Sequence, residues 1–150
     1  MKRRDVVMAG AAAAVTQTVL SATGCKAEAT ATAATAQAAI APDDLLGVLG
    51  PCTTVGEVCL THCLRRLAQG DGSLGECAMR VREMLAVCRV TETLAAAGSE
   101  YLSQAAALCA DVCESCRLEC EKHASHHREC AECAKACAAV IPLAKAVAQA

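Results

Sequence analysis

Cysteines in the second half of this chain recur at the spacing of a helix face. Seven thiols follow one another at intervals of three or four residues, in two runs: Cys109, Cys113, Cys116 and Cys120, then Cys130, Cys133 and Cys137. A helix turns about 100° per residue, so the thiols of each run fall within an arc of roughly 60°. Leucines usually occupy such positions on a buried helix face. The spacing predicts helices whose buried stripes consist of thiols.

The first half of the chain repeats the pattern at wider intervals. Five further cysteines keep to one face of their predicted helices: Cys52, Cys59 and Cys63 on one, and Cys77 and Cys88 on the next. Their intervals are seven, four and eleven residues, which are all close to whole helical turns. We therefore expect twelve core cysteines. The thirteenth, Cys25, lies before the predicted bundle.

Composition and the positions of glycine and proline predict an all-α protein. Hydrophobic residues make up 55% of the 150 residues, with one Tyr, no Phe or Trp, and three prolines. Five helices are expected, the first of them short: 42–50, 53–69, 74–97, 99–123 and 127 to the end. Gly50 with Pro51 ends the short helix, Ser99 caps the fourth, and Pro142 kinks or shortens the last. Short connections then predict an antiparallel four-helix bundle with a short N-terminal helix and cysteines lining the core.

The predicted bundle has two different ends. The turns at 70–73 and 123–127 lie together at one end, which we call the mouth, and the cysteines lie toward it. The opposite end is expected to be an apolar plug formed by eight side chains: Leu94, Ala95, Leu102, Ala105, Ala106, Leu108, Val140 and Ile141.

The first residues have the pattern of an export signal. Lys2, Arg3 and Arg4 precede an uncharged, Ala-rich stretch, and the paired arginines favour the twin-arginine route. This predicts a periplasmic location or an internal membrane lumen. Repeated A-x-A patterns place cleavage between about 31 and 38, and the alternative is lipoprotein processing at Cys25, which would add a lipid anchor. The predicted division is 1–35 as signal and low-complexity leader and 36–150 as the bundle domain.

Charge and motifs exclude several classes of function. The formal net charge is −2, and no cluster of basic residues after the N-terminus suits nucleic acid. No apolar run after residue 24 is long enough to span a bilayer. No pairing of nucleophile with base and no phosphate-binding loop stands out. We expect neither a nucleic-acid partner, nor a membrane span, nor an enzyme.

Thiolates along helices predict a soft metal cargo. They select Cu(I), zinc and iron–sulfur clusters, and pairs four residues apart suit Cu(I) between two sulfurs. One Cu(I) per thiolate would leave the core neutral, whereas fewer would leave buried negative charge. We therefore expect multiple Cu(I) ions, approaching one per core cysteine. Three alternatives remain open: a disulfide-stapled structural or redox protein, with Cys120 and Cys130 at a hairpin spacing, an iron–sulfur protein, and a zinc protein.

Other candidate ligands gather near the mouth. His62 lies about 80–100° from the stripe of its neighbours Cys59 and Cys63, so it is either a solvent-facing residue or a copper ligand at the mouth. His123, His126 and His127 suit a helix C-terminus through its dipole alone, or they bind incoming copper. Two methionines, Met79 and Met84, are core filler or thioether ligands, and Met79 is the better ligand candidate because it is nearer the mouth.

Three segments resemble a known family. CLTHC, CADVCESCRLEC and CAECAKAC, each on a different predicted helix, are similar to the bacterial cysteine-rich copper storage proteins, and the leader resembles that of the exported branch. The resemblance covers about residues 42 to 145. It implies a four-helix bundle whose inward cysteines hold many Cu(I) ions, a homotetramer, and a copper-acceptor enzyme such as particulate methane monooxygenase. His62 matches the family's mouth histidine.

Overall fold

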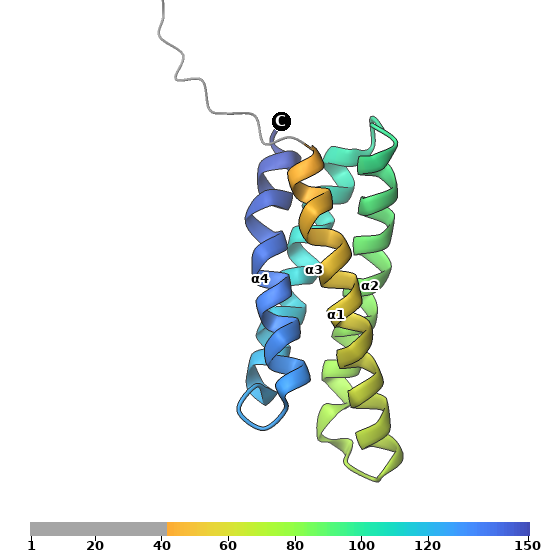
Figure 1. Ribbon diagram of the computed structural model, residues 1–150, viewed down its shortest axis with the longest axis vertical. Coiled ribbons are helices and arrows are strands. Elements are labelled where there is room, and N and C mark those ends of the chain that lie inside the picture. The colour runs from red at the N-terminus through yellow and green to blue at the C-terminus, as the bar shows by residue number, and fades with distance from the viewer. Residues whose placement is uncertain (1–41) are drawn as a thin grey trace, which may run out of the picture. The chain divides into compact units, whose positions relative to one another are not determined.

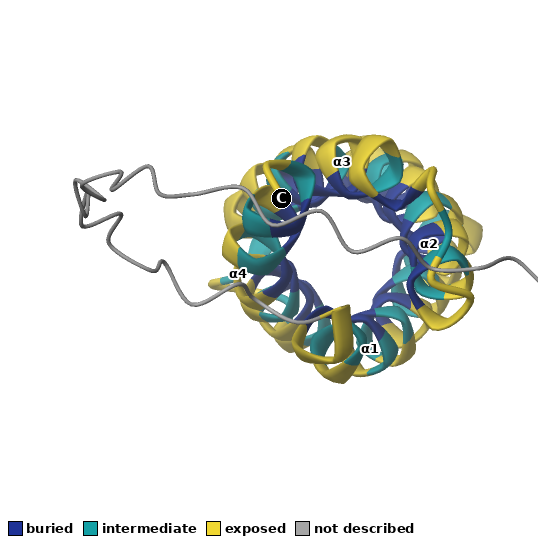
Figure 2. Ribbon diagram, turned by 90° about the horizontal axis from the view of Figure 1, so that it is seen from above, coloured by how far each residue is buried: buried dark blue, intermediate teal, exposed yellow. Residues whose placement is uncertain are grey.

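The computed structural model describes residues 42–150, which form an antiparallel bundle of four helices (Figure 1). The helices are α1 (Pro42–Ala68), α2 (Gly75–Ala96), α3 (Leu102–His123) and α4 (Arg128–Ala148), with a 3₁₀ turn, η1 (Gly72–Leu74), before α2. Viewed along its axis, the bundle is a ring in which each helix packs between two neighbours and turns its buried residues inward (Figure 2). The all-α four-helix architecture is confirmed. The predicted leader, its cleavage site and Cys25 lie outside the described residues.

Two glycines end helices where the sequence predicts turns. Gly70 and Gly98 have φ angles of 86° and 59°, in the left-handed region that costs glycine least. After α2, the backbone N–H of Ser99 returns to the carbonyl of Leu94 at 3.0 Å. This bond uses a carbonyl that the end of a helix leaves without an intrahelical partner.

The prediction of a separate short helix at 42–50 is wrong, because α1 runs without interruption through Pro51. Proline has no N–H to give to the carbonyl four residues earlier, but that residue, Gly47, is exposed, so water can solvate it. Continuing the helix also keeps Leu45 and Leu49, both fully buried, in line with Cys52. Burying two leucines contributes about 3–6 kcal/mol, which offsets the cost of about 3 kcal/mol for the proline.

Two further boundaries differ from the predictions. Helix α4 continues past Pro142 to Ala148, so the proline does not shorten it. Pro142 leaves the carbonyl of Ala138 without a hydrogen-bond donor. Ala138 is exposed, like Gly47, so water can solvate this carbonyl too. Ser99 does not cap the helix directly: α3 begins at Leu102, and the Ser99 hydroxyl accepts the Tyr101 N–H at 3.3 Å within the preceding turn.

The end opposite the mouth is apolar, but its members differ partly from the prediction. Ala95, Leu102, Ala106 and Val140 are buried as expected, whereas Leu108 is 52% exposed. Leu108 lies about 100° around the helix from Cys109, on the side opposite to Ala110, which is buried. The first and last turns of the bundle contribute four buried residues that the prediction omitted: Leu45, Leu49, Ala144 and Val147.

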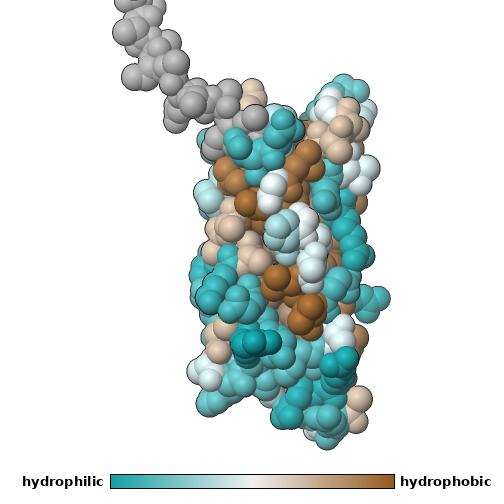
Figure 3. Space-filling view, in the orientation of Figure 1, coloured by the Kyte–Doolittle hydropathy of each residue, from teal (hydrophilic) through white to brown (hydrophobic). Residues whose placement is uncertain are grey.

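The surface also differs between the two ends. On the side shown in Figure 3, hydrophilic residues gather around the mouth, at the bottom of the view. Hydrophobic residues lie nearer the middle and the end opposite the mouth. None of the described helices combines the length and the apolar character needed to cross a bilayer.

Candidate metal centre

All twelve predicted core cysteines point into the bundle and are completely buried. Each of the four helices contributes at least two of them: Cys52, Cys59 and Cys63 from α1; Cys77 and Cys88 from α2; Cys109, Cys113, Cys116 and Cys120 from α3; Cys130, Cys133 and Cys137 from α4. Helical spacing alone brings them to one side of each helix. The predicted inward placement is confirmed for every one.

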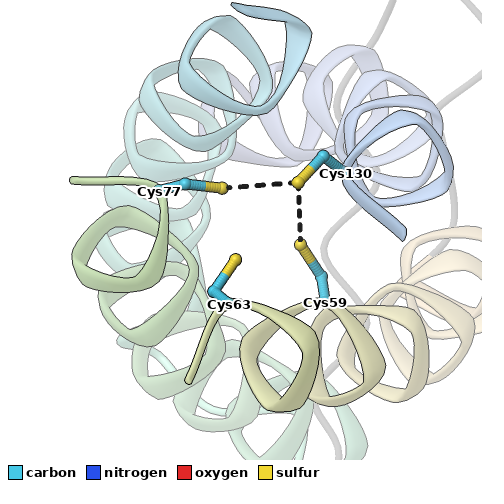
Figure 4. A group of neighbouring side chains, drawn as sticks. All are labelled: Cys59, Cys63, Cys77 and Cys130. Carbon is cyan, nitrogen blue, oxygen red and sulfur yellow. Dashed lines mark hydrogen bonds between the residues drawn. The ribbon is translucent and has the colours of Figure 1, made fainter. Parts of the chain in front are cut away.

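Four of these thiols form a group near the mouth. The sulfur atoms of Cys59, Cys63, Cys77 and Cys130 all lie within 4.8 Å of one another, and their side chains converge from α1, α2 and α4 (Figure 4). Cys130 Sγ is 3.9 Å from Cys59 Sγ and 3.8 Å from Cys77 Sγ. One small ion could contact several of these sulfur atoms at once.

From this group, contacts between sulfur atoms continue along the bundle axis toward the apolar end. Cys120 lies 3.6 Å from Cys77 and 4.0 Å from Cys116, and Cys116 lies 3.9 Å from Cys133. Two further groups of three thiols occupy the middle: Cys59, Cys120 and Cys133, and Cys116, Cys133 and Cys137. Cysteines thus recur in overlapping sets, with several thiols shared between neighbouring groups.

The deepest group lies next to the apolar end. Cys52, Cys88 and Cys113 have sulfur atoms within 4.8 Å of one another, and Cys88 Sγ is 3.6 Å from both Cys109 and Cys113. The twelve thiols therefore form a column along the bundle axis, which we call the thiol column.

The sulfur separations suit metal binding by free thiols. All twelve described cysteines are free, and the sulfur contacts of 3.6–4.0 Å far exceed a disulfide bond of about 2.05 Å. Two sulfurs about 2.3 Å from one ion, the metal–thiolate distance known for zinc, lie roughly 4.0 Å apart at a trigonal site. The four-thiol group alone also fits tetrahedral zinc, but the column offers far more ligands than one closed zinc site uses.

Burial raises the pKa of the column thiols, whereas the hydrogen bonds between them raise the pKa of one partner, such as Cys59, and lower that of another, such as Cys130. Hydrogen bonds with Cys120 and Cys130, followed by burial, raise the pKa of Cys59 well above its ordinary value. The pKa of Cys120 is likewise raised, first by Cys116 and then by Cys130. A metal ion that binds these sulfurs must therefore displace protons.

Two predicted histidines meet at the mouth. His62 Nε2 of α1 lies 2.9 Å from His127 Nδ1, just before α4, and His62 Nδ1 lies 3.6 Å from Glu129. His62 retains 22% of its side-chain exposure, so it is neither in the core nor fully in solvent. Because Cys63 follows His62 directly in α1, the imidazole pair lies at the same level of the bundle as the four-thiol group.

The other two histidines are placed differently. The ring of His123 is 6.4 Å from that of His127, and its buried Nε2, 3.5 Å from Glu119, forms no hydrogen bond among the described residues. Lys122 donates a hydrogen bond to Glu119 and lowers the pKa of that carboxyl. His126 is exposed and lies outside this cluster.

The prediction that Met79 is core filler is wrong, and its role as a thioether ligand stays a prediction. Met79 is 56% exposed and lines a groove on the outside of α1 and α2. Met84 is fully buried, and its Sδ accepts a hydrogen bond from Cys52 Sγ at 3.8 Å. Its spacing, seven residues after Cys77 and four before Cys88, is a signal that sequence analysis could have used to find it.

Comparisons with known proteins agree with this geometry. A family described as copper storage protein matches residues 41–148. The chain is 37% identical over 78 residues to the uncharacterized cysteine-rich protein YhjQ of Bacillus subtilis (strain 168), across 52% of this chain and 68% of that protein. The solved structure of the Cu(I)-bound copper storage protein BsCsp3 matches with a TM-score of 0.64 and 30% identity, over 71% of this chain and 96% of that one. This chain belongs to the copper storage protein family.

Proposed function

We propose that the thiol column stores many Cu(I) ions, approaching one per core cysteine, for supply to copper enzymes. The observation that carries the proposal is the column itself, twelve buried free thiols in overlapping groups. Thiolates are soft ligands that select Cu(I), zinc and iron–sulfur clusters, and sulfurs shared between neighbouring groups can bridge successive Cu(I) ions. The structure BsCsp3, which holds Cu(I), supports the same cargo.

Charge balance favours a full column. Among the described residues, Thr91 and Glu119 are the buried polar side chains, so no lysine or arginine lies in the core to neutralise thiolates. Each Cu(I) that replaces one thiol proton leaves the net charge of the column unchanged. An ion held by two unshared thiolates would instead leave one buried negative charge, which is costly in an apolar interior.

The same chemistry lets the empty protein remain folded. Protonated thiols behave as small hydrophobic side chains, so the column without copper is a core of ordinary polarity. Storage and release then require exchange of protons for copper and no unfolding of the bundle.

Location and partners extend the proposal. The paired Arg3 and Arg4 support export by the twin-arginine route to the periplasm or an internal membrane lumen, where an acceptor such as particulate methane monooxygenase could receive the copper. Replacing both arginines with lysine should retain the protein in the cytoplasm, as fractionation would show. The proposed homotetramer, which rests on the family resemblance, is tested by light scattering after size exclusion.

A competition between metals tests the nature of the cargo. The reduced protein is offered equal excesses of Cu(I) and Zn(II) without oxygen, and the bound metals are measured after desalting. We expect many copper ions per chain and little zinc. Mostly zinc, or an iron–sulfur chromophore in protein isolated from cells, would overturn the proposal.

A further inference from the structure

One sulfur atom beside the thiol column belongs to a methionine. Met84 is completely buried on the inner face of α2. Its Sδ lies 3.8 Å from Cys52 Sγ, within the range of the thiol–thiol contacts of the column. Cys52 also belongs to the deep group with Cys88 and Cys113, so Met84 borders a candidate copper site.

Met84 occupies a gap in the thiol pattern. Helices α3 and α4 contribute seven thiols, whereas α1 and α2 contribute five, and no cysteine lies between Cys77 and Cys88 on α2. Met84 stands in that interval and supplies a sulfur to the side of the column with fewer thiols.

A glycine on the facing helix makes room for this side chain. A Cβ at Gly56 of α1 would lie 2.7 Å from Met84 Cε and 2.9 Å from Leu85 Cδ2. Any other residue at position 56 would displace the methionine tip. Gly56 therefore lets the thioether reach across to Cys52, on the same helix as the glycine.

We propose that Met84 Sδ and Cys52 Sγ together bind Cu(I), which makes Met84 the thirteenth sulfur ligand of the column. Thioethers, like thiolates, are soft ligands that select Cu(I). The separation of 3.8 Å is close to the roughly 4.0 Å between two sulfurs at a trigonal ion. The proposal rests on copper storage and names a ligand that cysteine spacing does not reveal.

Charge distinguishes this pair from a pair of thiols. When Cu(I) binds, Cys52 loses one proton and its thiolate gives an electron pair, while the neutral thioether gives a second pair without losing a proton. The resulting unit is neutral with a single ion. A lone ion between two thiolates leaves a buried negative charge, so the Cys52–Met84 site fills among the first, when copper is scarce.

Selenomethionine tests the contact directly. The full chain is labelled with selenomethionine, loaded with one and then with saturating equivalents of Cu(I), and measured by X-ray absorption at the selenium edge. The chain has four methionines, so Met8→Leu and Met79→Leu serve as matched controls. We expect a short selenium–copper distance at both loadings in the wild type and in both controls, and its loss in Met84→Leu.

Chelator competition gives a second readout. In Met84→Leu, the affinity for the first copper ion should fall by roughly tenfold or more, because the loss of even a residue that hydrogen-bonds to a metal ligand lowers metal affinity by that factor. Later ions should still bind. If Met84→Leu does not fold, the double variant Met8→Leu/Met79→Leu decides, because Met84 is then its only internal methionine. A wild type that fills with copper but shows no selenium–copper distance overturns this inference alone. A wild type that binds no copper overturns the storage function.

Discussion

His62 Nε2 and His127 Nδ1 lie 2.9 Å apart and join α1 to the start of α4 at the mouth. The pair lies at the same level of the bundle as the four-thiol group, because Cys63 adjoins His62 and Cys130 follows His127 by three residues. Imidazole nitrogens bind copper as well as other transition metals. An ion that enters at this end would meet the histidine pair before the buried thiols.

Removing the pair should change the rate of copper exchange more than the capacity. In His62→Ala, we expect the rate of Cu(I) transfer to and from a chelator to fall by roughly tenfold, which is the usual effect of losing a partner residue at a metal site. The saturated protein should lose at most one ion. Stopped-flow absorbance measures the rate. His126→Ala, at an exposed histidine, is the control, and equal effects in the two variants would contradict a specific role for His62.

Each core cysteine should account for about one stored ion. Cys130 contacts both Cys59 and Cys77 (Figure 4). In Cys130→Ala we expect the saturated copper content to fall by about one ion per chain, because one thiolate charge is lost, while circular dichroism still shows the helical bundle. Metal analysis after desalting gives the content.

The thirteenth cysteine provides the matched control for this variant. Cys25 lies outside the described residues and outside the predicted core, so Cys25→Ala should leave the copper content unchanged. An equal loss in Cys25→Ala and Cys130→Ala would mean that copper content does not depend on the thiol column.

Copper binding should release protons and weaken as the pH falls. The raised pKa values of Cys59 and Cys120 mean that both thiols carry a proton at pH 7. Cu(I) must displace these protons, so lowering the pH favours the metal-free thiols and lowers the apparent copper affinity. An indicator dye in weak buffer should record about one proton per copper ion bound at these sites. Copper affinity that is independent of pH between 5 and 8 would contradict ligation by protonated thiols.

Substitution of alanine for two different glycines of α1 should have opposite effects on stability. Gly56→Ala places a Cβ against Met84 and Leu85 at less than 3.0 Å, and such overpacking costs about 1–3 kcal/mol. The gain of about 0.5–1 kcal/mol from alanine inside a helix offsets part of this cost, so its Tm should fall by roughly 2–10 °C. Gly47→Ala meets nothing within 4 Å and should stabilise the helix by about 0.5–1 kcal/mol. Thermal unfolding of the metal-free proteins checks both, and a Gly56→Ala variant as stable as Gly47→Ala would contradict the close packing.

The helices and the thiol column could be predicted from sequence because both follow from local spacing. Intervals of three, four, seven and eleven residues placed every core cysteine correctly. The effect of Pro51 could not be predicted this way, because it depends on the solvent exposure of Gly47 and on the burial of Leu45 and Leu49 after folding.

Contacts between distant residues were also beyond local spacing. His62 and His127 are 65 residues apart in the chain, and Cys52 and Met84 are 32 apart. Whether these residues come into contact depends on how far neighbouring helices are shifted along the bundle axis relative to each other. Short turns limit this shift but do not fix it. Sequence spacing could place Met84 on the inner face of α2, but not opposite Gly56 and Cys52.

Anaerobic titration of the reduced full chain with Cu(I) tests the storage function most directly. Copper is added in steps, unbound ion is removed by desalting, and the bound metal is compared with the thiol content of the same sample. We predict saturation near one Cu(I) per core cysteine, with thiols that become resistant to alkylation as copper binds. Saturation at one or two ions, with most thiols still reactive, would contradict storage in the thiol column.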